Sequence, residues 1–394
     1  KIKSTKTAVK EKLTSLVYLT SSSTLAAQDY IQGDAQSLFQ SVKKEIEKIS
    51  PKEPVLNQLP FYYKQLFLNK QHFLNEFWVS RETIMKSFLN ILEENQSISK
   101  SVILLLGDRN SGKSFWLNQA SSIAQQQTNI IVVQPTYNQT TDVKSFNNAI
   151  RKATRGMGTI ESVFENLKPG TCLAFDDLEL WWNQKESGNK VVSHLLKLIQ
   201  AYSAKVRFVL SANTISYEIM KRSTDLKNLQ PYIFICKPMN AKEIGKAVLK
   251  RHYSGGIPLG NMNRKNGRMS TIDEAKFFSK LFLLSFGNIG YAMQLWLSSI
   301  EKVEKDTIFI KKQELPDLRF LESLPSEWII ILNQLIIHKR LKFRYFESAD
   351  NNFIKTINEM LRSTILVESA KGYVSINSFI YPYILNYFQH NKLI

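Results

Sequence analysis

Short apolar runs alternate with amphipathic segments through the middle of the chain. The runs are SVILLLG, NIIVVQP, TCLAFDDLEL, KVRFVLSANT and PYIFICKPM, and most are separated by segments whose apolar residues have helical spacing. Strands that are apolar throughout and alternate with helices are typical of parallel sheets covered on both faces. The pattern therefore predicts an α/β core with a parallel sheet between two layers of helices.

The pattern changes after about residue 240, where the strand signal stops. The segments NAKEIGKAVLKRHYS and TIDEAKFFSKLFLLSFGNIGYAMQLWLSSIEKV have helical spacing, and the Gly/Asn/Arg-rich GGIPLGNMNRKNGRMS between them predicts a loop. From Pro325, two helical segments lead into ILVESAKGYVSINSF, which has the pattern of a hairpin around AKG. Helices followed by a hairpin predict a winged-helix-like unit.

The charge balance is strongly basic. The chain has 52 Lys plus Arg against 34 Asp plus Glu, a net charge of +18 and a pI near 9.6. Such a charge favours a polyanionic partner, and nucleic acid is the partner that we expect in preference to an anionic membrane surface. The composition, with 43% hydrophobic residues, is that of a chain with a buried core and excludes a disordered protein.

Cysteine usage and the N-terminus bear on the compartment. Cys172 and Cys236 each lie in an apolar run, which predicts buried packing in a reducing environment rather than a disulfide or a zinc site. The lysine-rich KIKSTKTAVKEKL at the start fits a mature chain that has lost a targeting segment, although trimming would look the same. No apolar run has the length of a membrane span.

The stretch GDRNSGKS matches the phosphate-binding consensus G-x-x-x-x-G-K-[ST] in full. Glycines let the backbone curl so that its N–H groups face the phosphates, and the following helix adds the positive end of its dipole. Lys113 supplies a charge to the β and γ phosphates, and the Ser114 hydroxyl is a ligand for Mg²⁺. Together with the next residue, the predicted nucleotide-binding set is Gly107, Asp108, Arg109, Asn110, Ser111, Gly112, Lys113, Ser114 and Phe115.

Polar residues follow two further strands. Asp176 and Asp177 end the run CLAF, where the first acid would complete the Mg²⁺ shell and the second could act catalytically by orienting a water. The alternative is a strand end with two solvated acids. Ser211 and Asn213 end the run VLSANT, where Asn213 is expected beside the γ-phosphate, although asparagine there can also serve only the turn.

A nucleotide-binding core followed by a helical lid and a winged helix resembles the AAA+ and Orc-like ATPases. In that superfamily the lid often carries an arginine, just after a Gly-Asp/Asn-x step, that turns onto the γ-phosphate. The comparable step here runs from Gly287 to Gly290, and a glycine stands where the arginine would be. Loss of such a charge can lower the hydrolysis rate by ~10³ or more by analogy with arginine fingers.

Four stretches in this order resemble the mitochondrial small-subunit ribosomal proteins of the death-associated protein 3 family, and a fungal member in particular. They are LLLGDRNSGKSFWL, VLSANTIS, YIFICKPMNAKEIGKAVLKRHYSGGI and AKFFSKLFLLSFGNIGYAMQLW, within about residues 60–300. The resemblance implies a protein in the head of the small subunit in the mitochondrial matrix. It also implies bound GTP or GDP with Mg²⁺, held by residues 107–114 and Asp176. A guanine-reading N-K-x-D motif is missing, since NKQH at 69–72 lacks the acid, so ATP stays an alternative.

Three functions are compatible with these features. The first is a ribosomal structural protein that binds small-subunit rRNA and neighbouring head proteins and contacts the large subunit. Such a protein would not be a homo-oligomer, and it would hydrolyse its nucleotide slowly or not at all. Its basic segments HKRLKFRYF (338–346) and NRKNGRM (263–269) suit phosphate contact and base stacking, or are only solvated faces. The second is an active AAA+/Orc-like ATPase acting on DNA through its winged helix, and the third is a signalling NTPase with protein partners only.

These patterns also set the predicted domain boundaries. They are a basic N-terminal extension over 1–55, a P-loop nucleotide-binding core over 56–240, a helical lid over 241–315 and a winged-helix-like C-terminal domain over 316–394.

Overall fold

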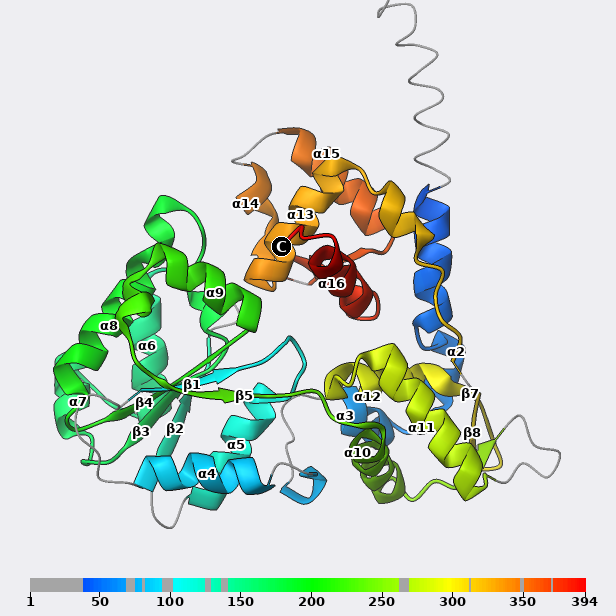
Figure 1. The fold of residues 1–394 in the computed structure, drawn as a ribbon, viewed down its shortest axis with the longest axis horizontal. Helices are drawn as coiled ribbons and strands as arrows, with labels where there is room; N and C mark the ends of the chain where they lie inside the picture. Colours follow the sequence, from blue (N-terminus) through cyan, green and yellow to red (C-terminus); the bar gives the residue numbers. More distant parts are fainter. Residues whose placement is uncertain are drawn as a thin grey trace, which may run out of the picture.

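A computed structural model describes the chain over residues 38–68, 75–79, 82–93, 102–124, 129–135, 141–261, 269–311, 313–347, 351–369 and 371–394. The lysine-rich N-terminal arm, the segment NKQH and most of NRKNGRM lie outside these described residues. The described residues form a core, a lid and a C-terminal unit that meet around one point (Figure 1).

The core is built on a five-stranded sheet with the strand order β2-β3-β4-β1-β5, in which every neighbouring pair is parallel. The predicted parallel α/β core is therefore confirmed. The strands are β1 (Val102–Leu106), β2 (Ile130–Val133), β3 (Cys172–Phe175), β4 (Arg207–Ala212) and β5 (Tyr232–Ile235). Because β4 lies between β3 and β1, the acids after β3 and the loop after β1 flank the end of β4.

The continuous burial of β1 reflects helices on both sheet faces. Leu104 and Leu106 pack into one hydrophobic cluster, whereas Ile103 and Leu105 pack into another, as expected from side chains that alternate across a strand. The helices of the first cluster are α6 (Val143–Thr154), α7 (Ile160–Asn166), α8 (Lys190–Tyr202) and α9 (Thr214–Ser223), and those of the second are α4 (Glu82–Glu93) and α5 (Lys113–Ala124). Short 3₁₀ helices lie at η1 (Asn75–Phe77), η3 (Leu178–Trp181), η4 (Glu186–Asn189) and η5 (Asp225–Asn228).

The lid contains the predicted helices α10 (Ala241–Ser254), α11 (Thr271–Ser285) and α12 (Ile289–Ser299). Capping boxes fix the first residues of α10 and α11, with Asn240 and Ser270 as the capping side chains. The lid also contains a small sheet, ordered β6-β8-β7, that the sequence pattern did not predict. Its strands are β6 (Leu259–Asn261), β7 (Ile300–Glu304) and β8 (Thr307–Ile310).

The missed strands have a local cause. The sequence was interpreted as helical as far as residue 303, but α12 ends at Ser299 and β7 begins at once. Lys305 and Asp306 join β7 to β8 with φ of 47° and 59°, as in a two-residue hairpin turn with two left-handed residues. Such turns usually carry Asn-Gly or Asp-Gly, so the pair Lys-Asp gives little signal in the sequence.

The C-terminal unit has the predicted winged-helix-like form. The hairpin expected around AKG pairs β10 with β11, and the antiparallel sheet has the order β10-β11-β9. The elements are η6 (Arg319–Ser323), α13 (Ser326–His338), β9 (Leu341–Lys342), α14 (Phe343–Glu347), α15 (Asn351–Arg362), β10 (Leu366–Glu368), β11 (Tyr373–Ile376) and α16 (Tyr381–His390).

Residues 38–68 pack with the lid and the C-terminal unit. The predicted boundaries place them in the N-terminal extension and at the start of the core. A helix over 38–49, α2 (Glu53–Gln58) and α3 (Phe61–Leu68) share one hydrophobic cluster with the lid and the C-terminal unit (Figure 1). The described part of the predicted extension thus packs one apolar face into this cluster, and the start of the predicted core packs against the lid. The cause lies in their apolar faces: α3, with Tyr63, packs against α10 and α12, α2 packs against β7, and Phe39 of the first helix stacks on Trp328 of α13.

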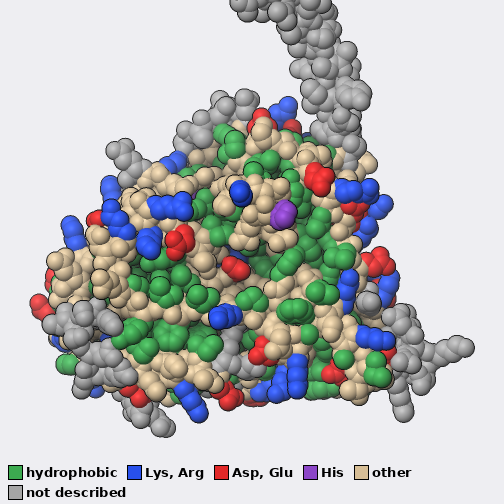
Figure 2. Space-filling view, in the orientation of Figure 1, with side chains coloured by type: hydrophobic (Ala, Val, Ile, Leu, Met, Phe, Trp, Pro, Cys, Tyr) green, Lys and Arg blue, Asp and Glu red, His purple; other side chains and the backbone are tan. Residues whose placement is uncertain are grey.

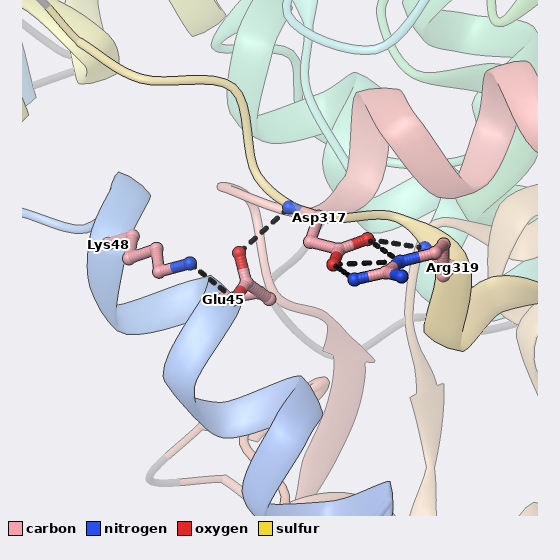
Figure 3. Close-up of polar contacts among 4 residues, drawn as sticks. All are labelled: Glu45, Lys48, Asp317 and Arg319. Carbon is pink, nitrogen blue, oxygen red and sulfur yellow. Dashed lines mark hydrogen bonds and ion pairs between the residues drawn. The ribbon is translucent and has the colours of Figure 1, made fainter.

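Polar contacts attach the helix over 38–49 to the segment that leads into the C-terminal unit (Figure 3). Glu45 accepts hydrogen bonds from the Lys48 ammonium at 2.5 Å and from the Asp317 backbone N–H at 2.8 Å. Arg319 in turn holds the Asp317 carboxylate and lowers the pKa of that carboxyl to about 2. These contacts therefore fix the helix over 38–49 to the segment that leads into the C-terminal unit.

Four further features concern the expected compartment and partners. Both cysteines are buried and neither is in a disulfide, and no helix among the described residues could cross a membrane. Over the same part of the chain, no group of three or more His, Cys, Asp and Glu side chains could hold a metal ion by itself. On the face shown in Figure 2, Lys and Arg side chains are spread over the surface with Asp and Glu among them, rather than gathered in one patch.

Candidate nucleotide-binding site

The phosphate-binding loop joins the end of β1 to the first residue of α5. Asn110 and Gly112 have φ of 64° and 97°, and the Ser111 N–H donates to the Asp108 carbonyl at 3.1 Å. Glycine tolerates the value at position 112 because it has no Cβ. Left-handed residues in a loop before a helix turn backbone N–H groups inward, and this arrangement binds phosphate.

Lys113 is the charged side chain inside the loop. It is only 6% exposed, and its ammonium donates to the carbonyls of Gly107 at 2.8 Å and Asp108 at 3.0 Å. An ammonium has three donors, so one remains for a phosphate oxygen. Burial raises the pKa of the Asp108 carboxyl, and the Lys113 charge opposes that rise.

Asp176 lies against the loop, as the sequence-based prediction requires of a metal-binding acid. Its carboxyl accepts a hydrogen bond from the Ser211 hydroxyl at 2.8 Å. Burial, and then the charge of Asp177, raises the pKa of this carboxyl, and the nearby Ser114 side chain opposes that rise. The structure thus brings Ser114, Asp176 and Ser211 together at the end of the sheet.

The paired oxygens of Ser114 and Asp176 fit Mg²⁺. This ion prefers hard oxygen ligands and is usually held by one or two carboxylates, substrate phosphates and water. Ser114 and Asp176 would hold it, and the ion would neutralise charge on the β and γ phosphates. The protein's part is to keep both oxygens on rigid elements, the first turn of α5 and the end of β3.

Asp177, the predicted catalytic residue, has a partner from another unit. Its backbone is left-handed, with φ 48° and ψ 56°, and its carboxylate lies 2.5 Å from the ammonium of Lys339 in the C-terminal unit. The two side chains are 19% and 22% exposed. Lys339 belongs to the basic segment HKRLKFRYF, and the structure pairs it with an acid of the nucleotide site.

Glu179 is a third acid of this cluster, and the sequence analysis missed it. It is 2% exposed and accepts the Asn213 backbone N–H at 3.1 Å. Burial, followed by the charge of Asp177, raises the pKa of the Glu179 carboxyl, while Lys339 and Lys113 oppose that rise. Its place two residues after Asp177 in DDLELWW was the available signal.

The Asn213 side chain forms hydrogen bonds with the backbone at the start of α9. Its side-chain oxygen caps α9 by accepting the backbone N–H groups of Ile215 at 2.9 Å and Ser216 at 3.3 Å. This cap fixes the amide, so only its NH₂ end can donate to a phosphate. The position thus serves the turn, and contact with the γ-phosphate stays a prediction.

The lid is hydrogen-bonded directly to the phosphate-binding loop. The Asn288 side chain caps α12 and donates its NH₂ to the Arg109 carbonyl at 2.8 Å. The Gly290 N–H donates to the Asn110 carbonyl at 3.1 Å. The first turn of α12 therefore holds the backbone of the loop between positions 109 and 110.

This contact leaves no room for a side chain at position 290. A Cβ added to Gly290 would lie 2.5 Å from the Asn110 Cβ and 2.7 Å from the Asn110 carbonyl oxygen. Both are atoms near or in the backbone, so they cannot move without shifting the loop. The glycine in place of a lid arginine is thus part of the packing between lid and loop.

Arg109 and Phe115 contact aromatic residues outside the phosphate-binding loop. The Arg109 guanidinium lies 5.1 Å from the ring centroid of Tyr381 at the start of α16. Its Nη1 atom is buried and has no hydrogen-bond partner among the described residues. The Phe115 ring stacks on Trp78 with centroids 5.6 Å apart. Arg109 therefore ties the loop to the C-terminal unit.

A cavity of about 100 Å³ opens beside the loop, and all three units line it. The residues around it are Asp108, Ser111, Cys236, Lys237 and Pro238 from the core, Ser285, Phe286, Gly287, Asn288, Ile289 and Tyr291 from the lid, and Pro382, Leu385, Asn386 and Gln389 from α16. The loop is therefore the place where core, lid and C-terminal unit meet.

The sheet, the loop and the paired acid define a P-loop nucleotide-binding fold with a lid and a winged-helix-like unit. No family model and no curated protein matches the chain.

Solved structures with a similar fold do exist. A Walker-type ATPase of Pyrococcus abyssi has a TM-score of 0.44 and 14% identity over 82% of this chain and 99% of that chain. The Orc2 protein of Aeropyrum pernix has a TM-score of 0.47 and 10% identity over 79% and 97%. The RuvB Holliday junction branch migration motor of Thermotoga maritima has a TM-score of 0.38 and 16% identity over 80% and 95%. At these identities the similarity concerns the fold alone.

Proposed function

We propose that this chain is a structural protein of the mitochondrial small ribosomal subunit that holds a guanine nucleotide with Mg²⁺ and hydrolyses it slowly or not at all. The motif resemblance and the charge of +18 support the ribosomal part of the proposal. On this proposal the protein lies in the head of the subunit in the mitochondrial matrix, where it contacts rRNA, neighbouring proteins and the large subunit as a single copy.

The contact between Gly290 and Asn110 carries the proposal of slow turnover. Fast phosphoryl transfer needs a positive group, beyond the loop lysine, that meets the charge of the transition state. In related folds the lid can supply an arginine, but here a side chain at position 290 would collide with the loop. In addition, the carboxylate of Asp177 is already paired with Lys339.

A nucleotide at this place would stabilise the arrangement of the three units. Its phosphates would bind the loop, which is hydrogen-bonded to α12 and contacts α16 through Arg109. A ligand that binds only the folded state adds RT ln(1 + [L]/Kd) to stability, ~4 kcal/mol at a thousandfold excess over Kd. The nucleotide is thus proposed as part of the structure, as a cofactor is in many proteins.

One alternative has a structural observation in its favour. The C-terminal unit has the winged-helix-like sheet β10-β11-β9 with α15 packed against α13 and β10, and such units can read DNA. An active ATPase that acts on DNA through this unit would use the same loop and acids. It would also need the positive group that position 290 cannot hold.

Co-sedimentation with mitochondrial small subunits over a salt series separates the two functions. We expect the purified protein to bind the subunits at 50 mM salt and to dissociate progressively toward several hundred millimolar, because contacts with phosphates release counterions. A duplex DNA of mixed sequence serves as the comparison ligand. A protein that stays free of the subunits at low salt and binds the duplex contradicts the proposal and supports the ATPase.

A further inference from the structure

The ion pair between Asp177 and Lys339 links the acid side of the nucleotide site to the C-terminal unit. The ammonium lies 2.5 Å from the carboxylate oxygen Oδ2, and both side chains are largely buried. Lys339 directly follows the last residue of α13, so its position depends on how that helix is anchored.

The end of α13 is fixed to the core. The Ser216 hydroxyl on α9 donates to the Ile337 carbonyl at 2.6 Å, and the ring of the buried His338 lies 5.1 Å from that of Trp182. Ile337 is also part of the hydrophobic cluster of the core. Lys339 thus projects from a rigid base.

Both members of the pair have unusual backbone conformations. Lys339 has φ 65° and ψ −45°, and the Arg340 N–H donates to the His338 carbonyl at 2.7 Å. These values describe a γ-turn with a positive central φ, which is rare and strained. Asp177 is left-handed as well, although neither residue is glycine. Strained residues of this kind persist where the surrounding structure holds them, and they gather at functional sites.

The pair lies where the terminal phosphate of a bound nucleotide is expected. Asp177 follows Asp176, and burial raises the pKa of the Asp176 carboxyl while the nearby Ser114 side chain, the other predicted Mg²⁺ ligand, lowers it. The buried Glu179 carboxyl is influenced by the charges of both Lys113 and Lys339. Two ammonium groups from different units therefore approach the same acidic cluster, and Lys113 is the one that the motif assigns to the phosphates.

We propose that Lys339 is a ligand of the terminal phosphate of a nucleoside triphosphate, supplied from the C-terminal unit of the same chain. Only one of its three donors is needed by Asp177, so the others can bind a phosphate oxygen. A diphosphate ends before this position and leaves Lys339 on Asp177. Lys339 thereby distinguishes triphosphates from diphosphates. The inference rests on the nucleotide site of the proposed function.

This role is compatible with slow turnover. A contact that is equally strong in the bound substrate and in the transition state raises affinity without raising the rate of the chemical step. Lys339 acts in this way, as a compact point charge on the bound triphosphate. No bond is made or broken at this residue.

The test is a comparison of nucleotide affinities in the full-length protein with Mg²⁺. The ligands are GDP and a non-hydrolysable GTP analogue, with the matching adenine pair, titrated into the wild type, Lys339→Met and Lys339→Arg. We expect Lys339→Met to weaken binding of the triphosphate analogue about tenfold, ~1.4 kcal/mol, and to change diphosphate binding less than twofold. Lys339→Arg keeps the positive charge and should keep the preference for the triphosphate.

One control variant and two contrary outcomes complete the test of Lys339. Lys355→Met, at an exposed position on α15 in the same unit, should change neither affinity. Equal losses for both nucleotides in Lys339→Met, or no loss for either, would overturn the role of Lys339 while leaving the nucleotide site in place. A wild-type protein that binds no nucleotide contradicts the proposed function itself, and with it this inference.

Discussion

Gly290→Arg will lower nucleotide retention at least tenfold instead of creating an active ATPase. The substitution introduces the residue type that AAA+ ATPases often carry at the comparable step of the lid, but its Cβ alone would lie 2.5 Å from the Asn110 Cβ. To relieve that overlap, α12 must move away from the loop and lose the hydrogen bonds at Asn110 and Arg109. A tenfold loss corresponds to ~1.4 kcal/mol, which is within the range expected for two hydrogen bonds and their packing.

The measurement is the nucleotide content of the purified variant, together with its affinity for added nucleotide. Gly290→Ala should show a smaller loss in the same direction, because the overlap begins at the Cβ. Ser298→Ala is the matched control, since it lies on the same helix but two turns from the loop. Full retention in Gly290→Arg with faster phosphate release would show that the lid can accommodate an arginine, contrary to this account.

Lys113→Ala should abolish nucleotide retention and lower the melting temperature. It removes the buried ammonium that faces the phosphates and the two bonds that it gives to the loop carbonyls. With a nucleotide at a thousandfold excess over Kd, the lost ligand stabilisation is ~4 kcal/mol. Assembly into the ribosome should be impaired as a consequence, because the three units lose their common ligand.

Nucleotide extracted from the denatured protein and a thermal melt with and without added nucleotide measure this effect. The melting temperature of the wild type should rise with nucleotide, whereas that of Lys113→Ala should not respond. Lys227→Ala, an exposed lysine in η5, is the control and should behave as the wild type. Equal nucleotide content in Lys113→Ala and the wild type would contradict the assignment of this loop as the nucleotide-binding loop.

The fold of the core was predictable because its signals are local. Continuous apolar runs predict buried parallel strands, and β1 and β4 have that pattern and that burial. The lid sheet was not predictable, since the hairpin at Lys305 and Asp306 lacks the usual turn residues. The packing of residues 38–68 was not predictable, since their apolar faces are covered by units that follow much later in the chain.

The sequence likewise predicts some residues of the nucleotide site and not others. The loop, Ser114 and Asp176 follow a fixed spacing that chemistry imposes, so the sequence contains enough to place them. Lys339 reaches Asp177 only because α13 docks on the core, and nothing local to either residue indicates that contact. Glu179 was visible as a third acid, but its burial depends on how the chain turns after β3.

In the proposed function this loop holds its nucleotide without consuming it. The most direct test is the rate of phosphate release by the purified wild-type protein with GTP or ATP and Mg²⁺. We predict turnover at ~10⁻² s⁻¹ or slower, as in P-loop proteins that have a single charge of this kind or none. Turnover at ~1 s⁻¹ or faster, within the range of dedicated enzymes, would contradict the claim.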